Sequence, residues 1–173
     1  MEKIHDYCRA HNYVVPTVYQ GNYNPLARRQ ETVLLPTLRR LGISFYAYSP
    51  IAGGFLAKTR QQILDGSGRF GEGSSYRKLY GHERLLEALS IWNDIADAAG
   101  ASPPELAYRW VTFNSPLKRE DGDAIIVGTS SLSQLKETLG WIGKGPLDQQ
   151  TASKIDAFWE QVQDHAPLDN FHG

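Results

Sequence analysis

The chain has 173 residues, a length that suits one globular domain with a sizeable core. Hydrophobic residues make up 41% of it and charged residues 21%, and the formal net charge of −1 lacks the basic excess of a nucleic-acid-binding protein. The sequence contains no apolar run near the roughly 20 residues that span a bilayer, and its first residues lack the apolar segment of a signal peptide. We therefore expect a cytoplasmic protein that binds neither nucleic acids nor membranes.

The first predicted element is a helix over residues 2–12. Its apolar positions recur at the helical period and are Ile4, Tyr7, Cys8 and His11. Cys8 is the one cysteine, which excludes an intramolecular disulfide. Its place in this stripe favours packing in the core or at its margin over the role of a reactive thiol.

A strand and a second helix are predicted next. The β-branched run at residues 14–20 predicts the strand, and residues 21–25 have the composition of a turn. Helix-forming residues then continue from 28 to 41. We expect a kink or a restart at Pro36 and an end at Gly42.

A second strand, residues 43–48, precedes a long stretch without clear periodicity. Residues 58–80 are rich in Gly, Ser, Arg and Tyr, so we expect a functional or mobile loop there. A helix is predicted over residues 81–99, with Gly100 at its end. The apolar stripe of this helix consists of Leu85, Leu89, Trp92, Ile95, Ala96 and Ala99.

The C-terminal third predicts three more helices and one strand. Ser102 has the position of an N-cap, followed by proline and glutamate in the first turn of a helix that continues to Phe113. Residues 123–127 predict the third strand, and helices from Ser131 and over residues 148–163 follow. The stripe of the helix from Ser131 consists of Leu132, Leu135, Leu139 and Ile142.

The alternation of strands and helices predicts parallel βαβ units and therefore an α/β fold. Three parallel strands leave two open edges and an exposed apolar face, as part of a larger α/β barrel would. The sequence has no internal repeat, and its tail, residues 165–173, is expected to be loosely held. We predict a single domain, residues 1–173, that is part of a (β/α)8 TIM barrel.

The third strand and the helix after it have the pattern of a phosphate site. Gly128, Thr129 and Ser130 form a turn of small residues at the start of a helix, where unpaired N–H groups and the helix dipole favour an anion. An alternative needs no ligand, because Ser131 and Gln134 have the spacing of a capping box. Both interpretations remain open at this point.

Two further features follow predicted strands. Tyr48 precedes a glycine-rich turn and is suited to stack on a flat ring, although an aromatic residue before an ordinary turn is the simpler interpretation. Gln20 closes an apolar strand and is, taken alone, consistent with a surface glutamine. These residues and the phosphate-site pattern all lie at carboxyl ends of strands, the edge where α/β sheets and barrels bind ligands.

The chain resembles an aldo-keto reductase over nearly its whole length and in the same order. The similar segments are residues 15–24 (the sixth strand and following loop of that family's barrel), 45–56 (the seventh), 102–110 (the helix between the last two strands) and 124–139 (the eighth strand and its helix). The sequence Ala52-Gly53-Gly54 and the loop with Arg69-Phe70 are similar to the aflatoxin-aldehyde reductase branch.

This resemblance implies an NADP(H) site and a role for each matching residue. Gln20 would bond the nicotinamide carboxamide, and Tyr48 would stack on the nicotinamide ring. The pyrophosphate would be wrapped by Ser49, Pro50, Ile51, Ala52, Gly53 and Gly54. The adenosine end with its 2′-phosphate would be held by Gly128, Thr129, Ser130, Ser131 and Gln134, and the adenine by Glu137 and Thr138. Arg69 and Tyr76 would border the substrate.

The chain also departs from the family pattern. Thr138 stands where the family often has Asn, and Gly128 and Gln134 stand where many members have Lys or Arg near the 2′-phosphate. The family's catalytic Asp, Tyr, Lys and His belong to the first four strands and have no matching positions, so the resemblance implies no catalytic residue here. Scattered histidines and the lack of metal-ligand spacing predict neither a replacement site nor a metal site.

Two functions of different classes follow. The chain is either the NADP(H)-binding C-terminal half of an aldehyde or ketone reductase, or a non-catalytic nucleotide-binding or self-associating half-barrel. The first would act on a small carbonyl substrate only when an N-terminal half completes it. The second would form a homo-oligomer through its open strand edges.

Overall fold

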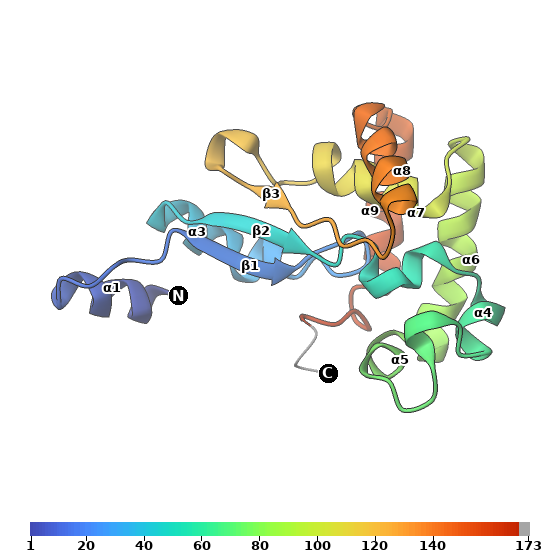
Figure 1. The fold of residues 1–173 in the computed structure, drawn as a ribbon, viewed down its shortest axis with the longest axis horizontal. Helices are drawn as coiled ribbons and strands as arrows, with labels where there is room; N and C mark the ends of the chain where they lie inside the picture. The colour runs from blue at the N-terminus through green and yellow to red at the C-terminus, as the bar shows by residue number, and fades with distance from the viewer. Residues whose placement is uncertain (170–173) are drawn as a thin grey trace.

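The computed structural model describes residues 1–169, in which helices alternate with a parallel sheet (Figure 1). The helices are α1 (Glu2–Ala10), α2 (Gln30–Val33), α3 (Leu35–Leu41), α4 (Arg60–Leu64), α5 (Ser75–Tyr80), α6 (Glu83–Ala98), α7 (Pro103–Arg109), α8 (Leu132–Gly143) and α9 (Gln149–Val162). The strands are β1 (Val18–Asn22), β2 (Ser44–Tyr48) and β3 (Ala124–Ile125). Short 3-10 turns cover Ala52–Ala57, Gly68–Phe70 and Arg119–Asp121.

The sheet has the strand order β1-β2-β3, and both pairs are parallel. β1 pairs with β2 from Val18 opposite Ser44 to Asn22 opposite Tyr48. The prediction of a strand over 14–20 was therefore displaced, because pairing begins only where β2 offers a partner. Upstream of β1 the chain is solvated, and Val14 is 92% exposed.

β3 is shorter than the predicted strand over residues 123–127. Asp123 does not pair in the sheet, because its carboxylate accepts hydrogen bonds from Arg39 and from the backbone N–H groups of Phe45 and Lys118. Beyond β3, Ile126 still donates its N–H to the Ala47 carbonyl at 2.8 Å, after which no described strand lies alongside the chain. The sheet thus ends close to the carboxyl end of β2.

The helix predicted over residues 28–41 is two helices, α2 and α3, as the proline indicated. Pro36 lies in the first turn of α3, where its missing N–H costs no hydrogen bond. Gly42 ends α3 in the left-handed conformation, with φ of 64°. The restart and the stop predicted at these two residues are confirmed.

The loop predicted over residues 58–80 was wrong in part, because this segment contains α4 and α5. Thr59 and Gln62 form a capping box at the start of α4, and Ser74 caps α5. Phe70, Leu79 and Tyr80 are buried, so the segment is folded onto the core. The helices are short and polar on one side, which hid them from a search for periodicity.

Helices α6, α7 and α9 contribute many of the residues of the buried core. The predicted stripe of α6 is buried except for the half-buried Ala99, and Trp92 packs on Phe158 of α9 with ring centroids 5.5 Å apart. The helix predicted to run from Ser102 to Phe113 ends as an α-helix at Arg109 and continues as a π-turn, Trp110–Asn114. Buried Trp110 joins this turn to Tyr23 after β1, with ring centroids 5.8 Å apart.

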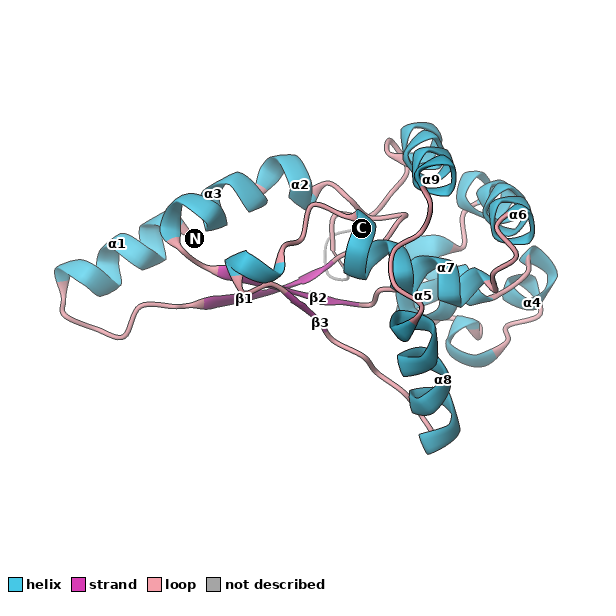
Figure 2. Cartoon of the chain, turned by 90° about the horizontal axis from the view of Figure 1, so that it is seen from above, coloured by secondary structure: helices cyan, strands magenta, loops and turns pink. Residues whose placement is uncertain are grey.

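One face of the sheet is covered and the other is open. Figure 2 shows α1, α2 and α3 along one side of the strands, and none of the described helices lies along the other. Phe45 and Ala47 point to the covered side and are fully buried, whereas Val18 and Tyr46 are 43% and 36% exposed. This open parallel sheet agrees with the predicted fold, part of a larger α/β barrel.

The structure changes what was expected of the apolar stripes of α1 and α8 and of the tail. α1 and α8 form where expected, but their apolar stripes are not buried: Ile4, Tyr7, Leu132 and Leu139 are all more than half exposed. Cys8 is half-buried, as expected for the margin of the core. The start of the tail is not loose, because Ala166 and Pro167 are buried. Residues 170–173 lie outside the described part of the chain.

Candidate functional site

A cavity of about 570 Å³ lies beyond the carboxyl ends of β2 and β3. Its walls come from the loop after β2, the chain between β3 and α8, the segment between β2 and α6, and Tyr108 of α7. The lining residues are Tyr48, Ser49, Pro50, Ile51, Gly53, Gly54, Lys58, Gly68, Arg69, Tyr108, Ile126, Gly128, Thr129, Ser130 and Gln134. Segments far apart in the sequence thus meet at the edge where ligands bind in α/β folds.

The loop after β2 has an unusual backbone. Ser49 and Ala52 have φ of 54° and 52°, a conformation that non-glycine residues rarely adopt. Gly53 and Gly54 follow with φ of 67° and 104°. A side chain at Gly53 would collide with the Tyr76 ring, since a Cβ there would lie 2.0 Å from it. Glycine is therefore required both for the turn and for the close approach of α5.

The turn before α8 is organised by Ser130, Ser131 and Gln134. The Ser131 hydroxyl caps α8 by accepting the Gln134 N–H at 3.2 Å. The Gln134 side-chain oxygen reaches back and accepts the Ser130 N–H and hydroxyl, each at 2.9 Å. The capping interpretation is thus confirmed, with the return bond one residue earlier than in a standard capping box. Ser130 and Gln134 still line the cavity, so capping and ligand binding are compatible here.

Most of the predicted cofactor residues line this one cavity, but five of them do not. Gln20 lies exposed on β1, and Glu137 lies exposed on α8. Ala52 is fully buried behind the loop, and Ser131 serves as the cap. Thr138 is buried, is hydrogen-bonded to the Tyr108 hydroxyl and is not among the residues that line the cavity. Tyr76, which the resemblance places next to the substrate rather than the cofactor, does not line the cavity either and packs over Gly53 beside it.

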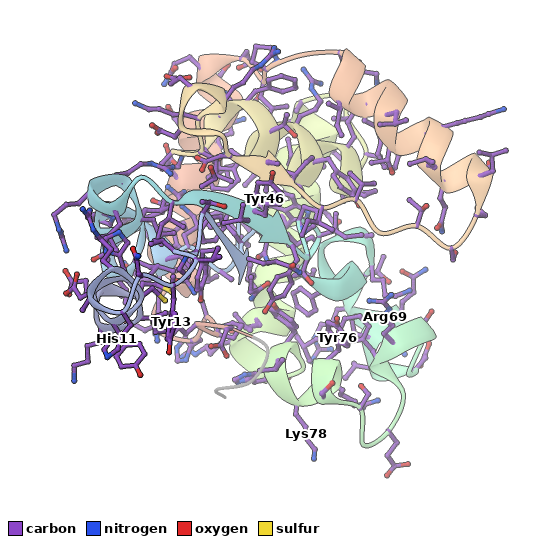
Figure 3. All side chains as sticks on the ribbon, turned by 60° about the vertical axis from the view of Figure 1, so that its left-hand side comes forward. His11, Tyr13, Tyr46, Arg69, Tyr76 and Lys78 are labelled. Atoms are coloured by element: carbon purple, nitrogen blue, oxygen red, sulfur yellow. The ribbon has the colours of Figure 1, made fainter. Side chains whose placement is uncertain are left out.

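Figure 3 shows the side chains of Arg69 and Tyr76 close together. The guanidinium of Arg69 sits 5.6 Å from the centroid of the Tyr76 ring, a cation–π arrangement that keeps the charge at the opening. Arg69 is exposed and lines the cavity. That Arg69 borders a substrate, as the resemblance implies, stays a prediction.

Sequence reasoning missed Lys58, which brings a second cation to the cavity. Its ammonium donates to the Ser67 hydroxyl at 3.1 Å and lines the same wall as Arg69. None of the residues that line the cavity is acidic, so two cations act there without a compensating carboxylate. A lone lysine four residues after Gly54 gave no signal by itself, because only the fold of the 58–80 segment turns it inward.

Tyr108 is the other residue that the sequence did not single out. Burial raises the pKa of its phenol, and the hydrogen bond from Thr138 opposes that rise. The ring therefore presents a neutral aromatic surface to the cavity at ordinary pH. A positively charged, partly aromatic cavity with a glycine-rich wall is suited to an anionic ligand that carries flat rings.

Residues 1–169 contain neither a metal-binding cluster nor a membrane-spanning helix. No group of three or more His, Cys, Asp and Glu side chains is arranged there to hold a metal ion. Within the same residues, no helix combines the length and the apolar character needed to cross a membrane.

Comparison with known proteins gives the family. The chain is 41% identical over 172 residues to the oxidoreductase sirO of Leptosphaeria maculans, which covers 96% of this chain and 52% of that protein. It is 39% identical over 171 residues to aflatoxin B1 aldehyde reductase member 2 of Homo sapiens and 38% over 176 residues to that of Rattus norvegicus, covering 48% of each. The chain thus spans about half the length of these relatives. The model of the Aldo/keto reductase family matches residues 1–160, and the chain belongs to that family.

Proposed function

We propose that this chain is the NADP(H)-binding C-terminal part of an aldehyde or ketone reductase barrel. The observation that carries the proposal is the cavity itself. It joins a loop of left-handed residues, a capped helix start and two cations, Lys58 and Arg69, with no acidic side chain in its lining. The phosphates of a dinucleotide bind to such a combination of backbone N–H groups and positive charge.

The residues present fit the parts of that cofactor. Tyr48 and Tyr108 offer aromatic surfaces, the loop over residues 49–54 offers close backbone approach to a pyrophosphate, and Ser130 with Gln134 offers polar groups to a 2′-phosphate. When bound, NADPH supplies a hydride to a carbonyl carbon, while the protein positions the ring and excludes water. The names of the aflatoxin B1 aldehyde reductases support an aldehyde as the substrate class.

Catalysis would need groups from outside this chain. The open face of the sheet and the exposed stripes of α1 and α8 are the surfaces that further barrel strands and helices would cover. We therefore expect the isolated chain to bind the cofactor without reducing a carbonyl. Reductase activity should arise only when a segment with the family's Asp, Tyr, Lys and His is supplied.

The first experiment is a titration with NADPH followed by cofactor fluorescence. We expect saturable binding that Ser130→Glu abolishes, because a carboxylate at the helix start would repel a phosphate. Lys58→Ala and Arg69→Ala should each weaken binding about tenfold, the effect of losing one charge-assisted bond. Ser153→Glu and Lys154→Ala, on the exposed side of α9, are the matched controls and should bind normally. Equal binding by Ser130→Glu and the wild type would contradict the proposal.

A second candidate function is a self-associating half-barrel without catalysis. The specific observation that favours it is the partly apolar open face of the sheet, where Val18 and Tyr46 are exposed. Such a face and unpaired strand edges promote association. The two candidates differ in cofactor binding, which only the first requires.

A further inference from the structure

A chain of buried hydrogen bonds runs behind the loop after β2. Asn22, Asn24 and Tyr80 are all fully buried. The Tyr80 hydroxyl accepts from Asn22 Nδ2 at 3.3 Å, and Asn22 Oδ1 accepts from Asn24 Nδ2, also at 3.3 Å. Asn24 Nδ2 donates in addition to the Ser49 carbonyl at 3.0 Å. These bonds connect α5 with the first residue of the loop, 31 positions away along the chain from Tyr80 (80 − 49).

The connection ends at Ser49, whose backbone conformation needs support from its surroundings. It adopts φ of 54° without being glycine, so surrounding contacts must hold it there. Because Pro50 has no N–H, the Ser49 carbonyl is the polar group through which neighbours orient that peptide. It accepts from Asn24 and also from the Ala52 N–H at 2.8 Å, which closes the turn.

α5 also contacts the loop through its rings. Tyr76 covers Gly53 so closely that a Cβ could not be added there. The Tyr80 ring stacks on Phe55, with centroids 5.5 Å apart and an interplanar angle of 28°. The loop is thus held at its start by Tyr80 of α5 acting through the two asparagines at and just after the end of β1, and further along by the aromatic rings of α5.

We infer that Tyr80 is a positioning residue, which acts through Asn22 and Asn24 to hold the loop over residues 49–54 in its left-handed conformation before a ligand arrives. A loop fixed in advance loses less conformational freedom on binding and therefore binds more tightly. That the ligand contains a pyrophosphate rests on the proposed function. The positioning of the loop does not, so the two can be tested separately.

Tyr80→Phe removes the hydroxyl and keeps the stacking on Phe55. It leaves the buried Asn22 amide without its acceptor, so the chain of bonds to Ser49 loosens. In native-state hydrogen exchange we expect the amides of Ala52, Gly54 and Leu56 to exchange roughly tenfold faster, with α6 unchanged. These amides donate to Ser49 and Ile51 within the loop. Asn24→Ala, which removes the donor to Ser49 directly, should give the same pattern.

Tyr23→Phe is the matched control. It also removes a fully buried hydroxyl, but this one donates to Glu31 at 2.7 Å and takes no part in the chain of bonds. Its loop amides should exchange as in the wild type. Unchanged loop exchange in both Tyr80→Phe and Asn24→Ala would overturn the inference, whether or not the protein binds a cofactor.

Ligand binding provides an independent measurement. Tyr80→Phe should weaken NADP⁺ about tenfold and leave the affinity for adenosine 2′-monophosphate within about twofold, because the latter has no pyrophosphate for the loop to hold. An equal loss for both ligands would show general damage and overturn the inference. If the wild type bound neither ligand, the proposed function would fail and hydrogen exchange alone would decide the positioning role.

Discussion

At the scale of single residues, Asp123 is the clearest structural determinant outside the cavity. Its side chain is 1% exposed and pairs with Arg39, while its oxygens also accept the N–H groups of Phe45 and Lys118. One carboxylate therefore ties α3, the start of β2 and the turn before β3 together. This places it at the amino ends of the strands, opposite the cavity, the end of an α/β barrel that serves stability rather than chemistry.

We expect Asp123→Ala to lower the free energy of unfolding by about 3 kcal/mol, because it leaves two N–H groups without their acceptor and leaves Arg39 paired with Asp121 alone. Urea denaturation followed by tryptophan fluorescence measures this. Asp94→Ala, at an exposed position of α6, is the control and should change stability by less than about 0.5 kcal/mol. Equal effects of the two substitutions would show that the bonds of the Asp123 carboxylate contribute nothing to stability.

Tyr80 also makes stability depend on pH. Burial raises its pKa to about 12, while hydrogen bonds with Asn22 and Asn24 limit the rise. The protonated phenol is thus favoured in the folded state, so this stability is complete below pH 10 and is lost as the pH rises through 12. Between pH 9 and pH 11 the loss should be about 1 kcal/mol.

The measurement is the unfolding free energy of wild type and Tyr80→Phe at both pH values. The variant should lose less stability between them, since it has no phenol at this position to ionise. Burial and Glu31 raise the pKa of Tyr23 as well, but that residue is present in both proteins and cancels in the comparison. An identical pH dependence in both proteins would remove Tyr80 as the cause.

At the scale of elements, two glycines of similar exposure have opposite roles. Gly42 ends α3 with φ of 64°, and Gly140 lies within α8. A Cβ at either position would meet no neighbouring atom within 4 Å, so only the backbone decides the effect of a substitution. Substitutions at these two glycines therefore measure separately the need for glycine at a helix end and the cost of glycine within a helix.

Gly42→Ala should destabilise the protein by about 1 kcal/mol, because alanine tolerates the left-handed conformation poorly. Gly140→Ala should instead stabilise it by up to about 1 kcal/mol, through higher helix propensity and a less flexible unfolded chain. Thermal unfolding of the two variants beside the wild type measures both signs. A stabilising Gly42→Ala would mean that α3 does not end as described.

At the scale of the whole molecule, the uncovered side of the sheet is the main surface that promotes association. The covered side packs on α2 and α3, while the other side shows Val18, Gln20 and Tyr46 to solvent. The outer edges of β1 and β3 pair with no other described strand. Apolar surface and free edges of this kind drive association unless another chain or segment covers them.

We therefore predict that the isolated chain associates as its concentration rises above the micromolar range, with an apparent mass above the 19.4 kDa of one copy. Tyr46→Lys should shift this association to at least about tenfold higher concentration, since a charge on the open face opposes apolar contact. Val33→Lys is the control, because Val33 is 65% exposed on α2, at the covered side. Sedimentation velocity distinguishes the outcomes, and equal behaviour of both variants would place the contact elsewhere.

The sequence by itself determined the order of the strands and of the helices outside the 58–80 segment, the parallel sheet, and most of the residues that line the cavity. Local chemistry was sufficient there, since Pro36, Gly42, Ser102 and Ser131 start or end elements through short-range hydrogen bonds and backbone preference. The lengths of the strands were not set by local chemistry, because each strand extends only as far as its neighbour pairs with it.

Tertiary structure decided the rest. Only the fold of the 58–80 segment brings Lys58 into the cavity and Tyr80 behind the loop, and only packing on α7 turns Thr138 away from the position that its sequence neighbours indicated. The apolar stripes of α1 and α8 were read correctly as patterns, yet their burial depends on a second surface that residues 1–169 do not supply. A sequence pattern specifies which face of a helix is apolar, whereas burial is a property of two surfaces that meet.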